Sequence, residues 1–341
     1  MKASVVIPTH NRPEKLSQLL NCLRNQDVPA DGYEVIVVDD NSLPPVTLEK
    51  TEGGPETSLI RLDETERSAA RNRGAAAARG EILLFVDDDM KVGKDFISNH
   101  LRAHERYPGA LVVGSVRLPE EAIATPFGRF RQRLEDNALP EASGPTTIEN
   151  FCTAANMSIA RERFKELGGF DGSIISSEDQ DFALRHSARG GQIVFAPEAR
   201  AIHCDHALDI RSYCRRAEWG SRMMIPFCLR YPDRADNIER HRINAPASFG
   251  REPLSQSIRK IIKSVLASKP ALLIFFTAAA FLERAAPDSR ALDRIYRLLL
   301  GAHILRGYRI GLKRTAVSIQ PSIEDHQLAA SNRQPAVKAE S

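Results

Sequence analysis

The chain has 341 residues, with 47 Lys and Arg against 44 Asp and Glu, a formal net charge of +3 and 42% hydrophobic residues. This length suits one large domain or two ordinary ones, with enough chain to bury a core. The composition excludes collagen-like, wholly disordered and multispanning membrane proteins. Basic residues are spread along the chain instead of forming a stripe, so no nucleic-acid partner is expected.

The cysteines form an odd, scattered set without a CxxC pair, at Cys22, Cys152, Cys204, Cys214 and Cys228. Such a set argues against a disulfide framework and a structural zinc site, and it fits a reducing compartment. The amino terminus shows no apolar region followed by a cleavage site. We therefore expect a cytoplasmic protein, with peripheral contact to the inner face of the cell membrane as a further expectation.

Strands and helices are predicted to alternate in the first part of the chain. Residues 3–7, 33–38 and 82–86 are apolar, β-branched runs typical of buried strands. A leucine repeat at helical spacing follows the first run. After an irregular stretch beyond the second run, an alanine-rich helix ends at Gly80. Such apolar strands between helices indicate a Rossmann-like, mostly parallel sheet with helices on both faces.

The pattern continues with mixed topology. The predicted elements are a helix over 96–107, a strand over 110–116, a basic loop over 129–133, a strand over 156–160, a helix over 177–189 and a strand over 193–196. Beyond about residue 244 the composition shifts to apolar helices. The end of the chain, after Val317, lacks the apolar content needed to pack and is predicted to be disordered.

Polar residues follow the predicted strands. Ligands of parallel sheets bind beyond the carboxyl ends of the strands, which here carry Pro8-Thr9, Asp39-Asp40 and Asp87 to Asp89. We expect them to converge in one crevice. Three adjacent carboxylates repel one another unless a cation offsets them, and such hard oxygen ligands suit Mg²⁺ or Mn²⁺ shared with phosphates. On an extended backbone Asp87 and Asp89 would point one way and Asp88 the other.

An isolated acidic triplet is more often a solvated turn. Its place after a buried strand, together with a second acidic pair after another strand, favours a nucleotide ligand instead. One carboxylate can accept from a base or ribose while another holds the metal that neutralises a diphosphate. Arg71 and Arg73 can add positive charge there, although a solvated helical face explains each equally well. Because no GxGxxG or GxxxxGK[ST] follows a strand, a dinucleotide dehydrogenase and a P-loop enzyme are disfavoured.

Successive segments resemble the ordered motifs of family 2 glycosyltransferases with the GT-A fold. They are SVVIPTHNR (4–12), VIVVDDNS (35–42), ARNRG (70–74), GEILLFVDDD (80–89), GGFD (168–171) and SEDQDF (177–182). The resemblance implies a nucleotide-sugar-binding half over residues 1–92 and an acceptor-binding half over 93–225. A helical extension over 226–315 and a disordered tail over 316–341 would follow.

The resemblance also implies an inverting transferase that uses a nucleotide-diphosphate sugar and Mn²⁺ or Mg²⁺. It carries donor contacts to Pro8, Thr9, Asn11, Arg12, Asp39, Asp40, Arg71, Asp87 and Asp88. The metal-binding DxD role falls to Asp87 and Asp89, with Asp89 as the direct ligand. A histidine of similar transferases approaches the metal or diphosphate, which makes His203 the candidate and His206 the reserve. A satisfied polar residue is an equal interpretation of His203.

A second acidic cluster, Glu178 and Asp179, opens a predicted helix. Ser177 can cap that helix, and acidic side chains in its first turn interact favourably with the helix dipole, without any catalysis. Inversion also needs a base that takes a proton from an acceptor hydroxyl. The resemblance implies that Asp179 is this base and that Glu178 orients the acceptor. Neighbouring carboxylates can raise the pKa of an aspartate and make it a stronger base.

The acceptor site and the carboxyl-terminal helices are less informative. Asn156, Trp219 and Arg222 are candidates to line the acceptor site, although Trp219 is more simply a core residue. Residues 271–282 are strongly apolar but fall short of the roughly 20 residues of a membrane span. Arg290–Arg314 suits either packing on the catalytic domain, which is favoured, or an anionic membrane surface, which would fit a lipid-linked acceptor.

The predicted function is inverting transfer of a sugar, expected to come from a UDP-sugar, to a hydroxyl of a glycan, lipid-linked glycan or other acceptor. A non-catalytic nucleotide-sugar- or polysaccharide-binding module of the same fold is the alternative. Asp87, Asp89 and Asp179 argue against that module, because binding alone requires no base. A sugar nucleotidyltransferase would need a glycine-rich loop where the chain has THNR (9–12).

Overall fold

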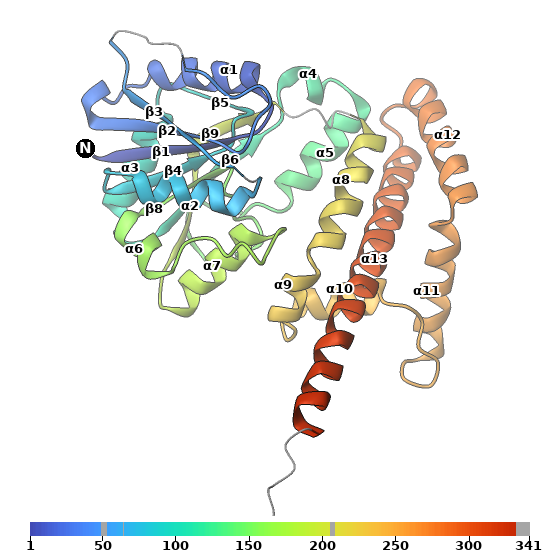
Figure 1. The fold of residues 1–341 in the computed structure, drawn as a ribbon. Helices are drawn as coiled ribbons and strands as arrows, with labels where there is room; N and C mark the ends of the chain where they lie inside the picture. Colours follow the sequence, from blue (N-terminus) through green and yellow to red (C-terminus); the bar gives the residue numbers. More distant parts are fainter. Residues whose placement is uncertain (49–52, 64, 205–208, 332–341) are drawn as a thin grey trace, which may run out of the picture. The chain divides into compact units, whose positions relative to one another are not determined.

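The computed structural model describes residues 1–48, 53–63, 65–204 and 209–331, with the side chains of 316–331 left out. The chain divides into two compact units, Met1–Ile210 and Arg211–Ser341 (Figure 1). Helix α8 (Ile210–Met223) falls almost wholly in the second unit. The boundary between the units therefore lies earlier than the predicted one at residue 225.

A nine-stranded sheet forms the centre of the first unit. Its strands are β1 (Ala3–Thr9), β2 (Tyr33–Asp39), β3 (Glu56–Arg61), β4 (Ile82–Val86), β5 (Met90–Val92), β6 (Leu111–Arg117), β7 (Gly144–Thr146), β8 (Asn156–Ala160) and β9 (Ile193–His203). Their order is β3-β2-β1-β4-β8-β6-β9-β5, and β7 pairs with β9. One sheet thus crosses the predicted boundary at residue 92.

The sheet is mostly parallel, with a mixed second half. β3, β2, β1 and β4 run parallel to one another, as do β6 and β9. β8 runs antiparallel to its neighbours β4 and β6, and β5 and β7 run antiparallel to β9. The carboxyl ends of β1, β2 and β4 consequently lie along one edge, as predicted.

Alternating apolar side chains of the central strands fill a core on each face of the sheet. Val6, Ile36 and Phe85 belong to one core, which is covered by α2 (Arg67–Ala77) through Ala70. Neighbouring strand residues belong to the other core, to which α1 (Pro13–Arg24) and α3 (Phe96–Arg106) contribute Leu19 and Phe96. Helices therefore cover both faces, because these strands are apolar at nearly every position.

Two stretches of the first unit that were predicted to be irregular form regular elements instead. The basic residues 129–133 form no loop, because they lie in α5 (Pro126–Asp136). Thr125 caps this helix by accepting from Gly128 N at 2.9 Å, and Phe127 and Phe130 supply its buried face. Strand β3 was missed, because most of its side chains are exposed and it has no apolar run. The unit is completed by a 3₁₀ turn and helices α4 (Glu120–Ile123), α6 (Arg161–Glu166) and α7 (Glu178–Ala188).

The second unit is helical. Besides α8 it contains α9 (Ile225–Arg230), α10 (Ala235–Asn244), α11 (Leu254–Leu266), α12 (Lys269–Ala285) and α13 (Arg290–Ser331). α13 buries Leu292, Tyr296, Leu299, Leu305 and Tyr308 at helical spacing, and it packs against α9 to α12. α13 therefore packs within its own helical unit.

The last helix of this unit extends further than predicted. α13 continues to Ser331, past residue 316 where the disordered tail was predicted to begin, and residues 332–341 lie outside the described part. Among the described helices, none is by itself long and apolar enough to cross a membrane. The pair α11 and α12 meets that test together but is bent by 69°.

Candidate active site

The carboxyl ends of β1, β2 and β4 bring the predicted donor-binding residues together. Thr9 pairs with Asp39 in the parallel register of β1 and β2. The hydroxyl of Thr9 donates to Asp88 Oδ2 at 2.7 Å, which ties β1 to the turn after β4. Polar residues from separate strands are therefore brought together at this edge.

Asp39 and Asp40 are buried and hold the loops beside them. The Asp39 carboxylate accepts from the backbone N–H groups of Ser42 and Val46 at 2.9 and 3.1 Å. Burial alone would raise the pKa of Asp39, but these hydrogen bonds and Arg61 lower it. Asp40 Oδ1 accepts from Glu66 N at 2.8 Å, at the start of α2. A base or ribose that donates to Asp39 or Asp40 would share a carboxylate that already accepts from backbone N–H groups.

Arg61 also lies in this region, although no sequence motif pointed to it. Its Nη1 lies 2.6 Å from Asp39 Oδ2, and its Nη2 donates to the carbonyl of Ser42 at 3.1 Å. The register of β2 and β3 pairs Arg61 directly with Asp39. Because β3 was not predicted, its pairing with β2 could not be used to place Arg61 beside Asp39. Arg73, in contrast, is exposed, which agrees with the solvated-face interpretation.

The acidic triplet departs from the predicted alternation. β4 ends at Val86, so residues 87–89 lie in a turn and not on an extended strand. Arg12 Nη1 lies 3.2 Å from Asp88 Oδ1 and 2.9 Å from Asp89 Oδ2. Asp88 and Asp89 therefore both contact the Arg12 guanidinium, whereas Asp87 contacts Arg71. The prediction that Asp87 and Asp89 point together was wrong because the backbone leaves the sheet before them.

Asp89 and His203 form the pair best suited to a metal ion. His203 ends β9 opposite Met90, and its Nε2 lies 3.4 Å from Asp89 Oδ1. That buried oxygen accepts no hydrogen bond from the described residues. Burial alone would raise the pKa of Asp89, but His203 lowers it. A carboxylate oxygen and an imidazole nitrogen fit Mn²⁺ or Mg²⁺ chemically.

The protein supplies only part of a metal coordination shell at this position. Within the described residues, no group of three or more His, Cys, Asp or Glu side chains could hold a metal ion. A cation bound by Asp89 and His203 would thus take its other ligands from phosphate or water, which is how Mg²⁺ is commonly held. His206, the reserve candidate, lies outside the described residues.

Arg71 joins the acidic triplet to the start of α7. Its side chain is buried, with Nη2 2.7 Å from Asp87 Oδ1 and Nη1 3.0 Å from Glu178 Oε1. The guanidinium also lies 5.8 Å from the centre of the Phe170 ring, in the GGFD segment. Its ionic contacts thus go to two carboxylates from distant parts of the chain. The resemblance implies that Arg71 contacts the donor. A phosphate that did so would share the guanidinium with Asp87 and Glu178.

Asp179 lies beside Glu178 at the start of α7. Ser177 adopts a left-handed conformation with φ of 74° and makes no side-chain cap, so the predicted capping role was wrong. Asp179 Oδ1 accepts from Gln180 N at 2.9 Å, and Oδ2 lies 3.4 Å from Ala154 N. Burial, with the neighbouring Glu178 carboxylate, raises the pKa of Asp179 to about 7. A carboxylate with this pKa is suited to act as a base near neutral pH.

The three residues predicted to line the acceptor site lie in different environments. Asn156 is fully buried within the sheet, where it donates to the carbonyls of Ser115 and Ala199 at 3.0 and 2.8 Å. It therefore cannot contact an acceptor, which corrects the prediction. Trp219 and Arg222 lie on α8 in the second unit, and the 45% exposure of Trp219 contradicts its expected burial.

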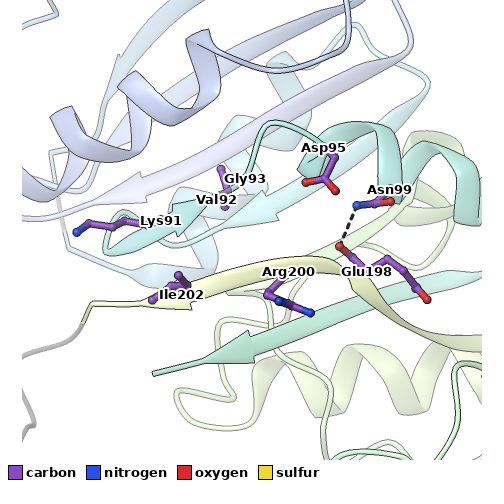
Figure 2. Close-up of a pocket in the computed structure, with 8 residues that line it drawn as sticks. All are labelled: Lys91, Val92, Gly93, Asp95, Asn99, Glu198, Arg200 and Ile202. Carbon is purple, nitrogen blue, oxygen red and sulfur yellow. Dashed lines mark hydrogen bonds between the residues drawn. The ribbon is translucent and has the colours of Figure 1, made fainter. Parts of the chain in front are cut away.

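A pocket of about 600 Å³ lies between β5, β9 and the start of α3 (Figure 2). Its lining residues are Lys91, Val92, Gly93, Asp95, Asn99, Glu198, Arg200 and Ile202. Asn99 Nδ2 donates to the carbonyl of Glu198 at 2.9 Å and closes one side. Lys91 and Ile202 are paired in the strand register immediately next to Met90 and His203. Because side chains alternate along a strand, Lys91 and Ile202 face away from Met90 and His203, and none of the predicted site residues lines the pocket.

Parts of the chain are similar in sequence to known glycosyltransferases. The sequence profile of Glycosyl transferase family 2 matches residues 4–167. The pre-mycofactocin glycosyltransferase of Mycobacterium tuberculosis is 25% identical over 236 residues, which are 68% of this chain and 48% of that protein. Poly(ribitol-phosphate) β-N-acetylglucosaminyltransferase TarS of Staphylococcus aureus is 35% identical over 104 residues, 29% of this chain and 18% of TarS. The chain thus spans about half the length of its mycobacterial relative, and less of TarS.

Solved structures agree on the fold. Mannosyltransferase PcManGT from Pyrobaculum calidifontis, in complex with GDP-Man and Mn²⁺, superposes with a TM-score of 0.55 at 18% identity, covering 89% of this chain and 86% of that one. S. aureus TarS 1–349 in complex with UDP-GlcNAc gives 0.51 at 16% identity, covering 91% of each chain. The nine-stranded sheet, its acidic strand ends and the profile match agree: residues 4–167 match glycosyltransferase family 2, and the fold is of the GT-A type.

Proposed function

We propose that this protein is an inverting glycosyltransferase that moves a sugar from a nucleotide-diphosphate donor to an acceptor hydroxyl. One observation carries the proposal: Asp179, whose pKa is raised to about 7, is connected through Glu178 and Arg71 to the acidic turn after β4. A base and a candidate diphosphate site thus share one network. A module that only binds sugars has no need for such a base, so the geometry favours the enzyme over the binding-module alternative.

The donor would bind at the strand ends. Thr9, Asn11 and Asp39 lie where β1 and β2 end, at the expected place for the nucleoside. Pro8, Asp40, Arg12, Asp87 and Asp88 complete the predicted donor contacts. Arg12, with 44% of its side chain exposed, can reach a phosphate while it faces the acidic turn. Asp88 is held by Thr9 and Arg12, and its proposed role is to fix the shape of this turn.

Asp89 and His203 are the residues proposed to hold Mn²⁺ or Mg²⁺. A divalent cation in this position neutralises the negative charge that develops on the departing diphosphate. The chain's own contribution is the placement of Asp89 Oδ1 and His203 Nε2 within 3.4 Å of each other. Metal dependence is therefore part of the proposal.

Asp179 is the proposed base. It takes the proton of the acceptor hydroxyl as that oxygen forms a bond to the anomeric carbon. The bond between the same carbon and the diphosphate oxygen breaks on the opposite side, and its electron pair leaves with the nucleoside diphosphate. Attack opposite the leaving group inverts the configuration. Glu178, which accepts from Arg71, lies next to Asp179 and is proposed to orient the acceptor.

The names and titles of similar proteins supply candidates for the donor and the acceptor. The TarS structure contains UDP-GlcNAc and the PcManGT structure contains GDP-Man with Mn²⁺. Nucleotide-diphosphate sugars are common to both, and a UDP-sugar is our first candidate. The name of TarS describes transfer to a phosphate-linked polymer. We accordingly propose a glycan or lipid-linked glycan acceptor of the cell envelope, reached by an enzyme in the cytoplasm.

A donor screen tests this function. The full chain is incubated with UDP-, GDP- and dTDP-sugars, with Mn²⁺ or Mg²⁺ and without acceptor, and release of the nucleoside diphosphate is measured. We expect slow hydrolysis of one donor, abolished by EDTA. Binding of a nucleotide sugar with no release, even when glycan acceptors are added, would instead support the binding-module alternative.

A further inference from the structure

The second unit contains a helix whose apolar side chains face outward. Along α11, apolar residues are exposed by between 43% and 65% of their surface, namely Leu254, Ile258, Ile261, Ile262 and Val265. Residues at this spacing occupy one face of a helix. A helix on a water-facing surface normally turns such a stripe toward the core. α11 therefore has the reverse orientation.

The opposite face of α11 is polar and buried. Ser257 Oγ donates to Glu252 Oε1 at 2.7 Å, and the buried Lys260 ammonium pairs with the same carboxylate. Lys263 Nζ donates to Asn244 Oδ1 at 2.8 Å, at the end of α10. Rotating α11 to bury its apolar stripe would break these contacts and leave Glu252 without its partner. The outward orientation is thus fixed by specific interactions.

α12 also exposes large apolar side chains, but its buried face is apolar instead of polar. Leu272 and Ala279 are buried, and α12 packs against α13. Leu273, Ile274 and Phe281 are between 64% and 68% exposed. Both helices of this bent pair therefore present large apolar side chains to the outside.

We propose that the exposed apolar faces of α11 and α12 dock on the surface of an anionic lipid bilayer. The segment from Arg251 to Arg284 holds six basic residues and two acidic ones. Glu252 is paired with Lys260, and Glu283 accepts from Tyr296 Oη at 2.7 Å. The basic side chains that stay exposed are Arg251, Arg259, Lys269 and Arg284. Apolar residues bordered by such cations are the composition of a helix that lies in a membrane interface.

The geometry favours lying on the bilayer over crossing it. α11 and α12 have 13 and 17 residues, whereas a span needs about 20, and they meet at 69°. A second copy of the chain is a poorer occupant. In a two-fold contact each copy presents the same patch, so the basic side chains of both copies would be brought together. Anionic headgroups, in contrast, complement them.

Co-sedimentation of the full chain with vesicles tests this inference. Binding is compared between phosphatidylcholine vesicles with and without phosphatidylglycerol, in the absence of any donor, so the outcome is independent of the proposed transferase activity. The apolar variant is Ile258→Gln, Ile262→Gln and Phe281→Gln combined, and the charge variant is Arg259→Glu with Lys269→Glu. The matched control is Leu229→Gln with Ile238→Gln, which are each 53% exposed on α9 and α10.

We expect the wild type to pellet with the anionic vesicles, and the apolar and charge variants each to lower the bound fraction by roughly tenfold or more. The control should bind like the wild type, and thermal unfolding should show that all variants are folded. Equal binding of the wild type and the apolar variant would overturn the proposal. Absence of wild-type binding, or a dimer in sedimentation equilibrium that the apolar variant dissociates, would also overturn it.

Discussion

Arg71 and Glu178 form a buried ion pair of 3.0 Å that connects the middle of α2 to the first residue of α7. The same guanidinium contacts Asp87 in the turn after β4, at 2.7 Å. Because Asp179 follows Glu178, the geometry of the proposed base depends on a residue from the proposed donor-binding half. We infer that donor site and base are held in register through Arg71, which acts as a positioning residue.

Replacement of Arg71 should affect both stability and the base. Arg71→Met leaves two carboxylates without their partner, and loss of one member of a buried ion pair costs about 3 kcal/mol or more. It also removes a positive charge that lowers the pKa of Asp179, so the activity of the folded variant should rise at higher pH than in the wild type. Arg71→Lys is the control: it keeps the charge but cannot contact both carboxylates in the same way. Urea unfolding and pH–rate profiles check this, and an unshifted profile in Arg71→Met would contradict the coupling.

The pH dependence of transfer should show one ionisation near neutrality. Burial and Glu178 raise the pKa of Asp179 to about 7, and only the carboxylate form can accept the acceptor's proton. We expect kcat/KM to increase about tenfold per pH unit below pH 7 and to level off above it. Steady-state rates between pH 5 and pH 9 measure this. A profile that is flat down to pH 5 would show that Asp179 ionises at its ordinary pKa.

The same pKa predicts an effect on stability. Between its unfolded pKa of about 3.9 and its folded pKa of about 7, Asp179 binds more protons in the folded state, so its contribution to stability falls as pH rises. Asp179→Asn lacks this ionisation and should gain about 2 kcal/mol relative to the wild type between pH 4 and pH 8, allowing for partial exposure of the side chain. Urea unfolding across this range tests it, with the exposed Asp31→Asn as control. A difference that does not change with pH would refute the raised pKa.

Metal binding should depend on Asp89 and His203. Calorimetric titration of Mn²⁺ in the presence of UDP is expected to show one site in the wild type. Asp89→Asn and His203→Ala should each weaken it by roughly tenfold or more, because each removes one of two protein ligands. Asp95→Asn, an exposed carboxylate in the neighbouring pocket, should bind Mn²⁺ normally. Unchanged affinity in Asp89→Asn would exclude this carboxylate as the ligand.

The sequence predicted the central strands well because they are apolar along their whole length. β4 and β8 have the predicted bounds, Ile82–Val86 and Asn156–Ala160. β3 gave no such signal, since an edge strand with exposed side chains does not need apolar residues. β9 was predicted only to residue 196, yet the strand continues to His203; its register with β6 shifts between Ala196 and Arg200.

For the site, the sequence predicted which residues meet but not which atoms they contact. Parallel topology was enough to bring Thr9, Asp39 and the acidic triplet to one edge. The direction of each carboxylate was not predictable, because the chain turns immediately after Val86. Asn156 was assigned to the acceptor, but its partners come from β6 and β9, which only the tertiary structure brings beside it.

Donor binding and turnover measured together in Asp179→Asn test the central claim most directly. The variant keeps the shape of the side chain and removes the base, so we expect donor affinity close to that of the wild type and transfer slower by ~10²–10⁴-fold. Asp181→Asn is the control on the same helix: its buried carboxylate pairs with Arg185 at 2.8 Å, so its loss should reduce stability but leave the turnover of folded enzyme nearly unchanged. Transfer by Asp179→Asn at close to the wild-type rate would contradict the assignment of the base.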